Sequence, residues 1–139
     1  MATTIKDIMT SNPIVYPASA TIAEAAQGMR EFDIGDVLVE VDGTVRGIVT
    51  DRDIVVRAVA DYGAPDAVTV GDICSEVLVT LSPTDSVDKA TQLMRDHALR
   101  RVPVIENGTA GGIVTLGDLA IERDSRSALA AISASPPND

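Results

Sequence analysis

The chain has 139 residues, of which 45% are apolar and only 2% aromatic, so a single compact unit or two half-units with an aliphatic core are expected. The formal net charge of −10 excludes general affinity for nucleic acid polymers or an anionic membrane, because phosphate binding needs a basic face. One cysteine excludes an intramolecular disulfide, and a start without an apolar secretion signal makes the cytoplasm the expected location.

An internal repeat organises the chain. A shift of 65 positions carries residues 7–54 onto residues 72–119 without a gap. A piece of about 50 residues buries too little surface to stand alone, so we expect the two copies to pack together and create a cleft related by a pseudo-two-fold axis. The predicted division is repeat 1 at residues 1–61, a linker at 62–71, repeat 2 at 72–125 and a flexible tail at 126–139.

Each repeat is predicted as strand, helix, strand, hairpin, strand and helix. In the first repeat, Thr21-Ile-Ala-Glu24 has the form of a capping box at a helix start. Apolar residues then recur at helical spacing on one face, and they are Ile22, Ala25, Ala26 and Met29.

The second half of the first repeat predicts a hairpin and a helix. Val37–Val41 and Val45–Val49 read as strands, and Asp42-Gly43 between them is a two-residue hairpin signal. Residues 51–61 predict a helix whose apolar side carries Ile54, Val55, Ala58 and Val59.

The second repeat follows the same order. Ser86 can cap a helix whose inward residues are Val87, Ala90, Leu93 and Met94. Val102–Glu106 predicts a strand, Asn107-Gly108 a second hairpin turn, and residues 116–124 the last helix.

One motif occurs in both repeats at the predicted step from strand to helix. Gly47-Ile-Val-Thr-Asp-Arg-Asp53 and Gly112-Ile-Val-Thr-Leu-Gly-Asp118 share the form Gly-apolar-apolar-Thr-x-x-Asp. The glycine allows a backbone or a flat ligand to approach closely, and the hydroxyl and carboxylate are suited to holding a ribose. The alternative is structural, because Thr-x-x-Asp is close to a capping box that needs no ligand.

These motifs carry a family resemblance. Together with Asp7-Ile-Met-Thr10 and Arg100-Arg-Val-Pro-Val104, they resemble a tandem pair of CBS domains, often called a Bateman module, over roughly residues 5–125. Asp33-Ile-Gly35 and Thr50-Asp-Arg-Asp-Ile54 are further similar to small stand-alone bacterial members, including the actinobacterial hypoxic-response type. The resemblance implies an α/β fold of two β-α-β-β-α repeats.

The resemblance also implies a ligand, because such modules commonly bind AMP, ADP, ATP or S-adenosylmethionine between their repeats. Thr50 with Asp53, and Thr115 with Asp118, match the ribose-holding positions. The other matching positions are Arg100 and Arg101 for phosphate, and the backbone near Val15 and Thr80 for adenine. Ile48 and Ile113 are candidates to pack on the base, with core strand residues as the alternative.

The two repeats differ in charge at the predicted phosphate position. The first has Gly35-Asp36 where the second has Arg100-Arg101, and Asp36 would repel a phosphate. We therefore expect inequivalent sites. The Asp36 site would be empty, need a bridging metal ion, or prefer an uncharged or cationic adenosine compound.

Other chemistry has little support. His97 and Cys74 align with Phe32 and Met9, which predicts packing positions, and they are too few for a zinc site. Asp36, Asp51 and Asp53 could gather around Mg²⁺, although acidic surface residues are usually solvated. No nucleophile–base pair is recognisable, so the chain is predicted to have no catalytic residue and no resident metal or cofactor.

The resulting hypothesis is a non-catalytic sensor of an adenine nucleotide. Ligand binding would favour one arrangement of the repeats, and an unidentified partner protein would recognise it. The helices after each Thr-x-x-Asp expose apolar faces, which predicts a homodimer. The alternatives are a constitutive dimeric scaffold or stress protein without a nucleotide, and a small metal- or redox-linked stress protein.

Overall fold

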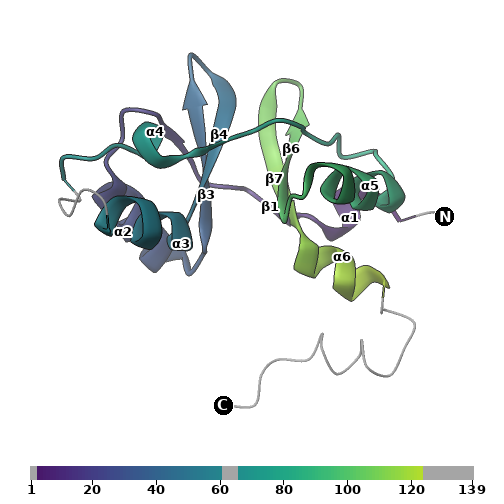
Figure 1. Ribbon diagram of the computed structural model, residues 1–139. Coiled ribbons are helices and arrows are strands. Elements are labelled where there is room, and N and C mark those ends of the chain that lie inside the picture. Colours follow the sequence, from purple (N-terminus) through teal and green to yellow (C-terminus); the bar gives the residue numbers. More distant parts are fainter. Residues whose placement is uncertain (1–2, 61–65, 124–139) are drawn as a thin grey trace. The chain divides into compact units, whose positions relative to one another are not determined.

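The computed structural model describes residues 3–60 and 66–123. They form two compact units, drawn in Figure 1, that do not coincide with the two sequence repeats. The described residues of unit 1 are 3–11, 79–106 and 111–123, and those of unit 2 are 12–60, 66–78 and 107–110. Each unit thus contains the opening segment of the other repeat.

Unit 2 is built on a four-stranded sheet in the order β2-β3-β4-β5. β2 (Val15–Pro17) runs parallel to β3 (Asp36–Val41), and β4 (Thr44–Thr50) and β5 (Ser75–Glu76) continue the sheet antiparallel. The helices are α2 (Ile22–Phe32), α3 (Asp51–Asp53), the π-helix η1 (Ile54–Val59) and α4 (Val70–Ile73). The core they enclose is aliphatic and includes Ile22, Ala25, Val37, Val49 and Val70.

Unit 1 has a three-stranded sheet in the order β1-β7-β6. Its elements are α1 (Ile5–Ile8), β1 (Thr10–Ser11), α5 (Val87–His97), β6 (Arg101–Glu106), β7 (Thr109–Thr115) and α6 (Leu116–Arg123). The position that β2 holds in unit 2 is reduced here to a parallel bridge between Leu81 and Val104. Ile5, Leu81, Ala90, Met94 and Val114 belong to its core.

The exchange of opening segments is symmetric. β1 pairs with β7, with Thr10 opposite Ile113, and β5 pairs with β4, with Ser75 opposite Ile48. A shift of 65 positions converts the first pairing into the second. The sequence repeat is therefore matched by equivalent strand pairings, and the predicted α/β fold of two repeats is confirmed.

Most predicted elements are confirmed. Both hairpin turns have the positive φ angles expected of a tight turn, 52° and 80° at Asp42-Gly43 and 53° and 77° at Asn107-Gly108. Thr21 accepts a hydrogen bond from the Glu24 amide at the start of α2, and Ser86 accepts one from the Lys89 amide at the start of α5.

Two details were predicted wrongly. Ala26 is exposed, and Gly28 takes its place on the buried face of α2 because the Tyr16 side chain passes over that glycine. The predicted helix at 51–61 is a short α3 followed by a π-helix. Val55 and Val59 on this π-helix are exposed, as expected for an apolar face that one chain does not cover.

The predicted linker and tail fall partly outside the described residues. α4 begins at Val70, inside the predicted linker at 62–71, whereas residues 62–65 and the predicted tail at 126–139 lie outside the described part of the chain. In the part that is described, no helix combines the length and apolar character needed to cross a membrane.

Candidate functional site

Both repeated motifs lie where a strand runs directly into a helix. β4 ends at Thr50 and α3 begins at Asp51, and β7 ends at Thr115 before α6 begins at Leu116. The motif therefore places a threonine at each N-cap and an aspartate in each first helical turn, as predicted.

The motif glycines are explained by strand pairing. A Cβ atom on Gly47 would lie 2.6 Å from the Cys74 sulfur, and one on Gly112 would lie 2.6 Å from the Met9 sulfur and 2.7 Å from the Thr10 carbonyl oxygen. Of the two reasons offered for these glycines, the close approach of another backbone accounts for both.

Each motif aspartate completes a capping box. The Thr50 amide donates to Asp53 Oδ2 at 2.9 Å, and the Asp53 amide donates to Thr50 Oγ1 at 3.0 Å. In unit 1, the Thr115 amide donates to Asp118 Oδ2 at 2.9 Å, and the Asp118 amide donates to Thr115 Oγ1 at 3.1 Å. The structural alternative is therefore realised in both repeats, and it uses one oxygen of each carboxylate.

The same arrangement occurs twice more. The threonine amide donates to the aspartate Oδ2 in all four Thr-x-x-Asp segments of the described chain, namely Thr4–Asp7, Thr50–Asp53, Thr69–Asp72 and Thr115–Asp118. These hydrogen bonds from Thr69 hold the pKa of Asp72 below its usual value. Capping is thus a general use of this pattern, and the pattern alone does not identify a ligand site.

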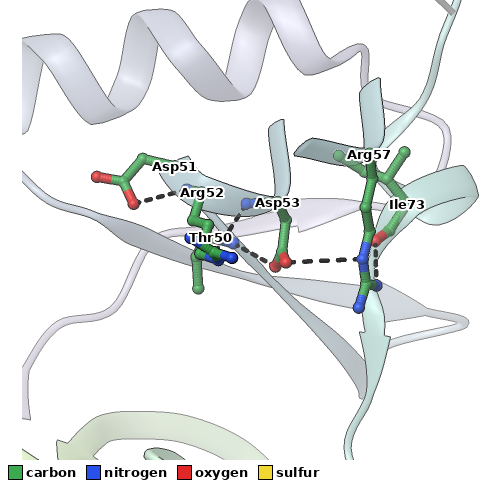
Figure 2. Close-up of polar contacts among 6 residues, drawn as sticks. All are labelled: Thr50, Asp51, Arg52, Asp53, Arg57 and Ile73. Carbon is green, nitrogen blue, oxygen red and sulfur yellow. Dashed lines mark hydrogen bonds and ion pairs between the residues drawn. The ribbon is translucent and has the colours of Figure 1, made fainter. Parts of the chain in front are cut away.

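The second carboxylate oxygen of Asp53 faces Arg57 (Figure 2). Asp53 Oδ1 lies 3.8 Å from Arg57 Nε, and Arg57 Nη1 donates to the Ile73 carbonyl oxygen at 3.1 Å. Arg57 thereby links the start of α3 to the end of α4. Sequence reasoning missed this residue, although its charge is opposite to that of Glu122, its counterpart in the second repeat.

The residues beside the two elements differ. In unit 2, Asp36 is the cross-strand neighbour of Thr50, and a Cβ atom on Gly35 would lie 3.4 Å from the Asp51 carboxylate. In unit 1, the Arg100 carbonyl oxygen accepts from the Leu116 amide at 2.8 Å, so an arginine backbone lies beside the start of α6. An acidic residue thus lies next to one element, and the main chain of an arginine lies next to the other.

The remaining predicted ligand residues have ordinary places in the fold. Val15 is half-buried in β2, Thr80 is exposed just before the Leu81 bridge, and Arg101 is the half-buried first residue of β6. Ile113 is only 4% exposed, whereas Ile48 is half-buried. Unit 2 contains Val15, Asp36, Thr50 and Asp53, and unit 1 contains Thr80, Arg100, Arg101, Thr115 and Asp118.

A cavity of about 390 Å³ lies between α5 and α6 in unit 1. It is lined by Arg95 and Arg100 and by apolar residues that include Leu99, Leu116 and Leu119. Of these residues, sequence reasoning had singled out only Arg100 as a ligand contact. Thr115 and Asp118, which form the capping box, are not among the residues that line this cavity.

The groups considered for other chemistry are dispersed. Within the described ranges, no three His, Cys, Asp or Glu side chains are grouped so that they could hold a metal ion. His97 is exposed at the end of α5. Burial raises the pKa of the Cys74 thiol, which disfavours the reactive thiolate form.

The profile of the CBS domain matches residues 5–59 and again residues 70–124. The chain belongs to the CBS-domain family. This CBS pair is 37% identical over 119 residues to the CBS domain-containing protein YhcV of Bacillus subtilis, with 86% of this chain and 84% of YhcV covered. It is 35% identical to Hypoxic response protein 1 of Mycobacterium tuberculosis, with 85% and 83% covered. The predicted resemblance is confirmed, and such a pair is a regulatory module.

Two solved structures are informative relatives. Hypoxic Response Protein I, solved with two coordinated zinc ions, superposes with a TM-score of 0.73 at 35% identity, covering 85% of this chain and 97% of that protein. The CBS domain pair of protein MJ0100, solved with 5′-methylthioadenosine and S-adenosyl-L-methionine, superposes with a TM-score of 0.77 at 26% identity, covering 91% and 100%.

Proposed function

We propose that this CBS pair is a non-catalytic regulatory module that binds an adenosine-containing ligand, of the AMP, ADP, ATP or S-adenosylmethionine class, through its Thr-x-x-Asp elements. The observation that carries the proposal is that capping uses only Oδ2 of Asp53 and of Asp118. A carboxylate with one remaining oxygen can still accept a hydrogen bond from a ribose hydroxyl. The MJ0100 pair, a structural relative that holds two adenosine compounds, supports this ligand class.

The proposed mechanism is a shift between conformations. A ligand that binds one arrangement of the chain more tightly than another stabilises that arrangement, and a separate partner protein then binds to it. We further propose that the module acts as a homodimer. Support comes from apolar side chains on the helices after each element, since Val55, Val56 and Val59 are 61%, 48% and 54% exposed, and Leu116 and Ile121 are 52% and 46% exposed.

The test is calorimetric titration with AMP, ADP, ATP and S-adenosylmethionine, comparing Asp118→Asn with Asp72→Asn. Asparagine keeps an oxygen for the capping bond but removes the charge. Loss of a charge-assisted ribose contact should weaken binding about tenfold or more in the Asp118 variant. Asp72 completes the same kind of box and is not proposed to touch ligand, so its variant should bind as the parent does. Equal affinity of both variants would assign Asp118 to capping alone.

A constitutive scaffold is the second candidate. It is favoured by the four identical capping bonds, because Asp7 and Asp72 make the same bond without being ligand candidates. A ligand at a concentration of 100 Kd stabilises its protein by about 2.7 kcal/mol, which raises the melting temperature measurably. No shift with any of the four adenosine compounds at millimolar concentration would favour the scaffold.

A further inference from the structure

We infer that Arg57 makes the two Thr-x-x-Asp elements unequal, by engaging the carboxylate oxygen of Asp53 that the ligand would need. The inference rests on the proposed function and adds which element the ligand prefers. Asp118 is then the main ribose-binding carboxylate, and Arg57 is a positioning residue that makes Asp53 less available to the ligand.

The geometry of Arg57 supports this role. Its guanidinium is anchored at one end, because Nη1 donates to the Ile73 carbonyl oxygen at 3.1 Å. The anchored group presents Nε to Asp53 Oδ1 at 3.8 Å, while Oδ2 of the same carboxylate accepts from the Thr50 amide. Both oxygens of Asp53 are therefore engaged, one by the cap and one by the ion pair (Figure 2).

The second repeat lacks this arrangement. A shift of 65 positions carries Arg57 onto Glu122, so Asp118 has a carboxylate instead of a guanidinium four residues further along its helix. Acidic side chains at this spacing repel each other weakly. In the described part of the chain, the hydrogen bond of the Asp118 side chain is the one that Oδ2 accepts from the Thr115 amide.

The acidic neighbour of the Asp53 element acts in the same direction. Asp36 lies opposite Thr50 on β3, whereas an arginine backbone lies beside the start of α6. An adenine nucleotide carries hydroxyl donors and negative phosphates. The element at Asp53 offers an engaged carboxylate and a nearby acid, while the element at Asp118 offers the carboxylate oxygen that capping does not use.

The size of the effect is limited by solvent. The side chain of Arg57 is 49% exposed and that of Asp53 is 17% exposed. A pair of this kind changes an equilibrium by up to about fivefold. Arg57 therefore lowers the affinity of the Asp53 element and does not abolish it, so the experiment must isolate that element.

The experiment titrates 5′-methylthioadenosine, which lacks phosphate, into the full-length Asp118→Asn chain with and without Arg57→Met. Removing Arg57 should tighten binding two- to fivefold. Arg52→Met is the matched control, because it removes the same charge from the adjacent helix α3, where the Arg52 main-chain amide donates to Asp51 Oδ1. It should leave the affinity unchanged. A purely structural role for Arg57 would leave the affinity unchanged or weaken it.

The outcomes separate this inference from the proposed function. If the parent chain binds and Arg57→Met fails to tighten the Asp53 element, the inference is overturned and the proposed function stands. If no chain binds 5′-methylthioadenosine or any of the four adenosine compounds, the proposed function fails. Urea denaturation of Asp53→Asn, Arg57→Met and the double variant then tests whether Arg57 engages Asp53. If the change in unfolding midpoint of the double variant differs from the sum of the two single changes, the engagement of Asp53 by Arg57 is supported. If the changes add, the engagement is overturned.

Discussion

Gly47 and Gly112 leave no room for a side chain, because each lies against a sulfur atom of the opening segment paired with its strand. Cys74 fills this position in unit 2 and Met9 in unit 1. The glycine and the sulfur-bearing residue belong to different repeats, so the glycine of the motif is required by a contact between distant parts of the sequence. This explains why a glycine precedes each Thr-x-x-Asp element without reference to any ligand.

Gly112→Ala should destabilise the protein by about 1–3 kcal/mol, because its Cβ would lie 2.6 Å from the Met9 sulfur and 2.7 Å from a carbonyl oxygen. Gly111→Ala is the control at the adjacent residue, where the nearest atom would be 3.9 Å away. Urea denaturation measures both. A Gly112 variant as stable as the Gly111 variant would contradict the packing described.

Residue-level prediction succeeded where the cause is local. Asp42-Gly43 and Asn107-Gly108 specify their turns through φ angles that glycine and asparagine or aspartate tolerate. It was incomplete for the Thr-x-x-Asp elements, because capping and ribose binding require the same residue types at the same spacing. The engagement of Oδ1 distinguishes Asp53 from Asp118, and it depends on Arg57, four positions after Asp53.

At the scale of elements, the main feature is the exchange of opening segments. α1 and β1 contribute to unit 1, and α4 and β5 contribute to unit 2. Ile5 and Val70, which are equivalent under the shift of 65 positions, are both fully buried, one in each core. A repeat in sequence was recognisable directly. The exchange of opening segments was not recognisable, because comparing the two copies at a shift of 65 positions does not show which strands pair.

Ile5→Ala should therefore destabilise the sheet of unit 1, and Val70→Ala the sheet of unit 2. Each removes methyl groups from a closed core, and the isoleucine change should cost about 2–5 kcal/mol. Hydrogen exchange followed by mass spectrometry should show faster exchange in residues 101–115 for Ile5→Ala and in residues 36–50 for Val70→Ala. Faster exchange in residues 36–50 for the Ile5 variant would mean that the units follow the sequence repeats instead.

The π-helix η1 shows where periodicity fails. The apolar residues after Asp53 fit a helical face, so a standard helix was predicted over 51–61. The observed i→i+5 bond from the Ala60 amide to the Val55 carbonyl widens the turn. A periodicity argument assumes a fixed number of residues per turn, so it cannot anticipate this change.

For the molecule as a whole, the exposed residues of η1 and α6 predict self-association. Val56 and Ile121 are equivalent in the two repeats and are 48% and 46% exposed. Replacing both with aspartate should convert a dimer into a monomer, because a charge in an apolar interface loses its hydration. Analytical ultracentrifugation measures the mass. Leu78→Asp, at a residue that is 64% exposed and lies outside these helices, is the control and should remain dimeric.

The exchanged segments also constrain how the chain can mature during synthesis. The described strands of unit 2 are complete once Glu76 has left the ribosome, so that sheet can form while the second half is still being translated. β1 is made before the strands of unit 2, yet its partner β7 is made about 100 residues later, which takes roughly 5–20 s at typical elongation rates. Residues 10–11 therefore remain without their partner strand until β7 has been synthesised, so the sheet of unit 1 closes later than the sheet of unit 2.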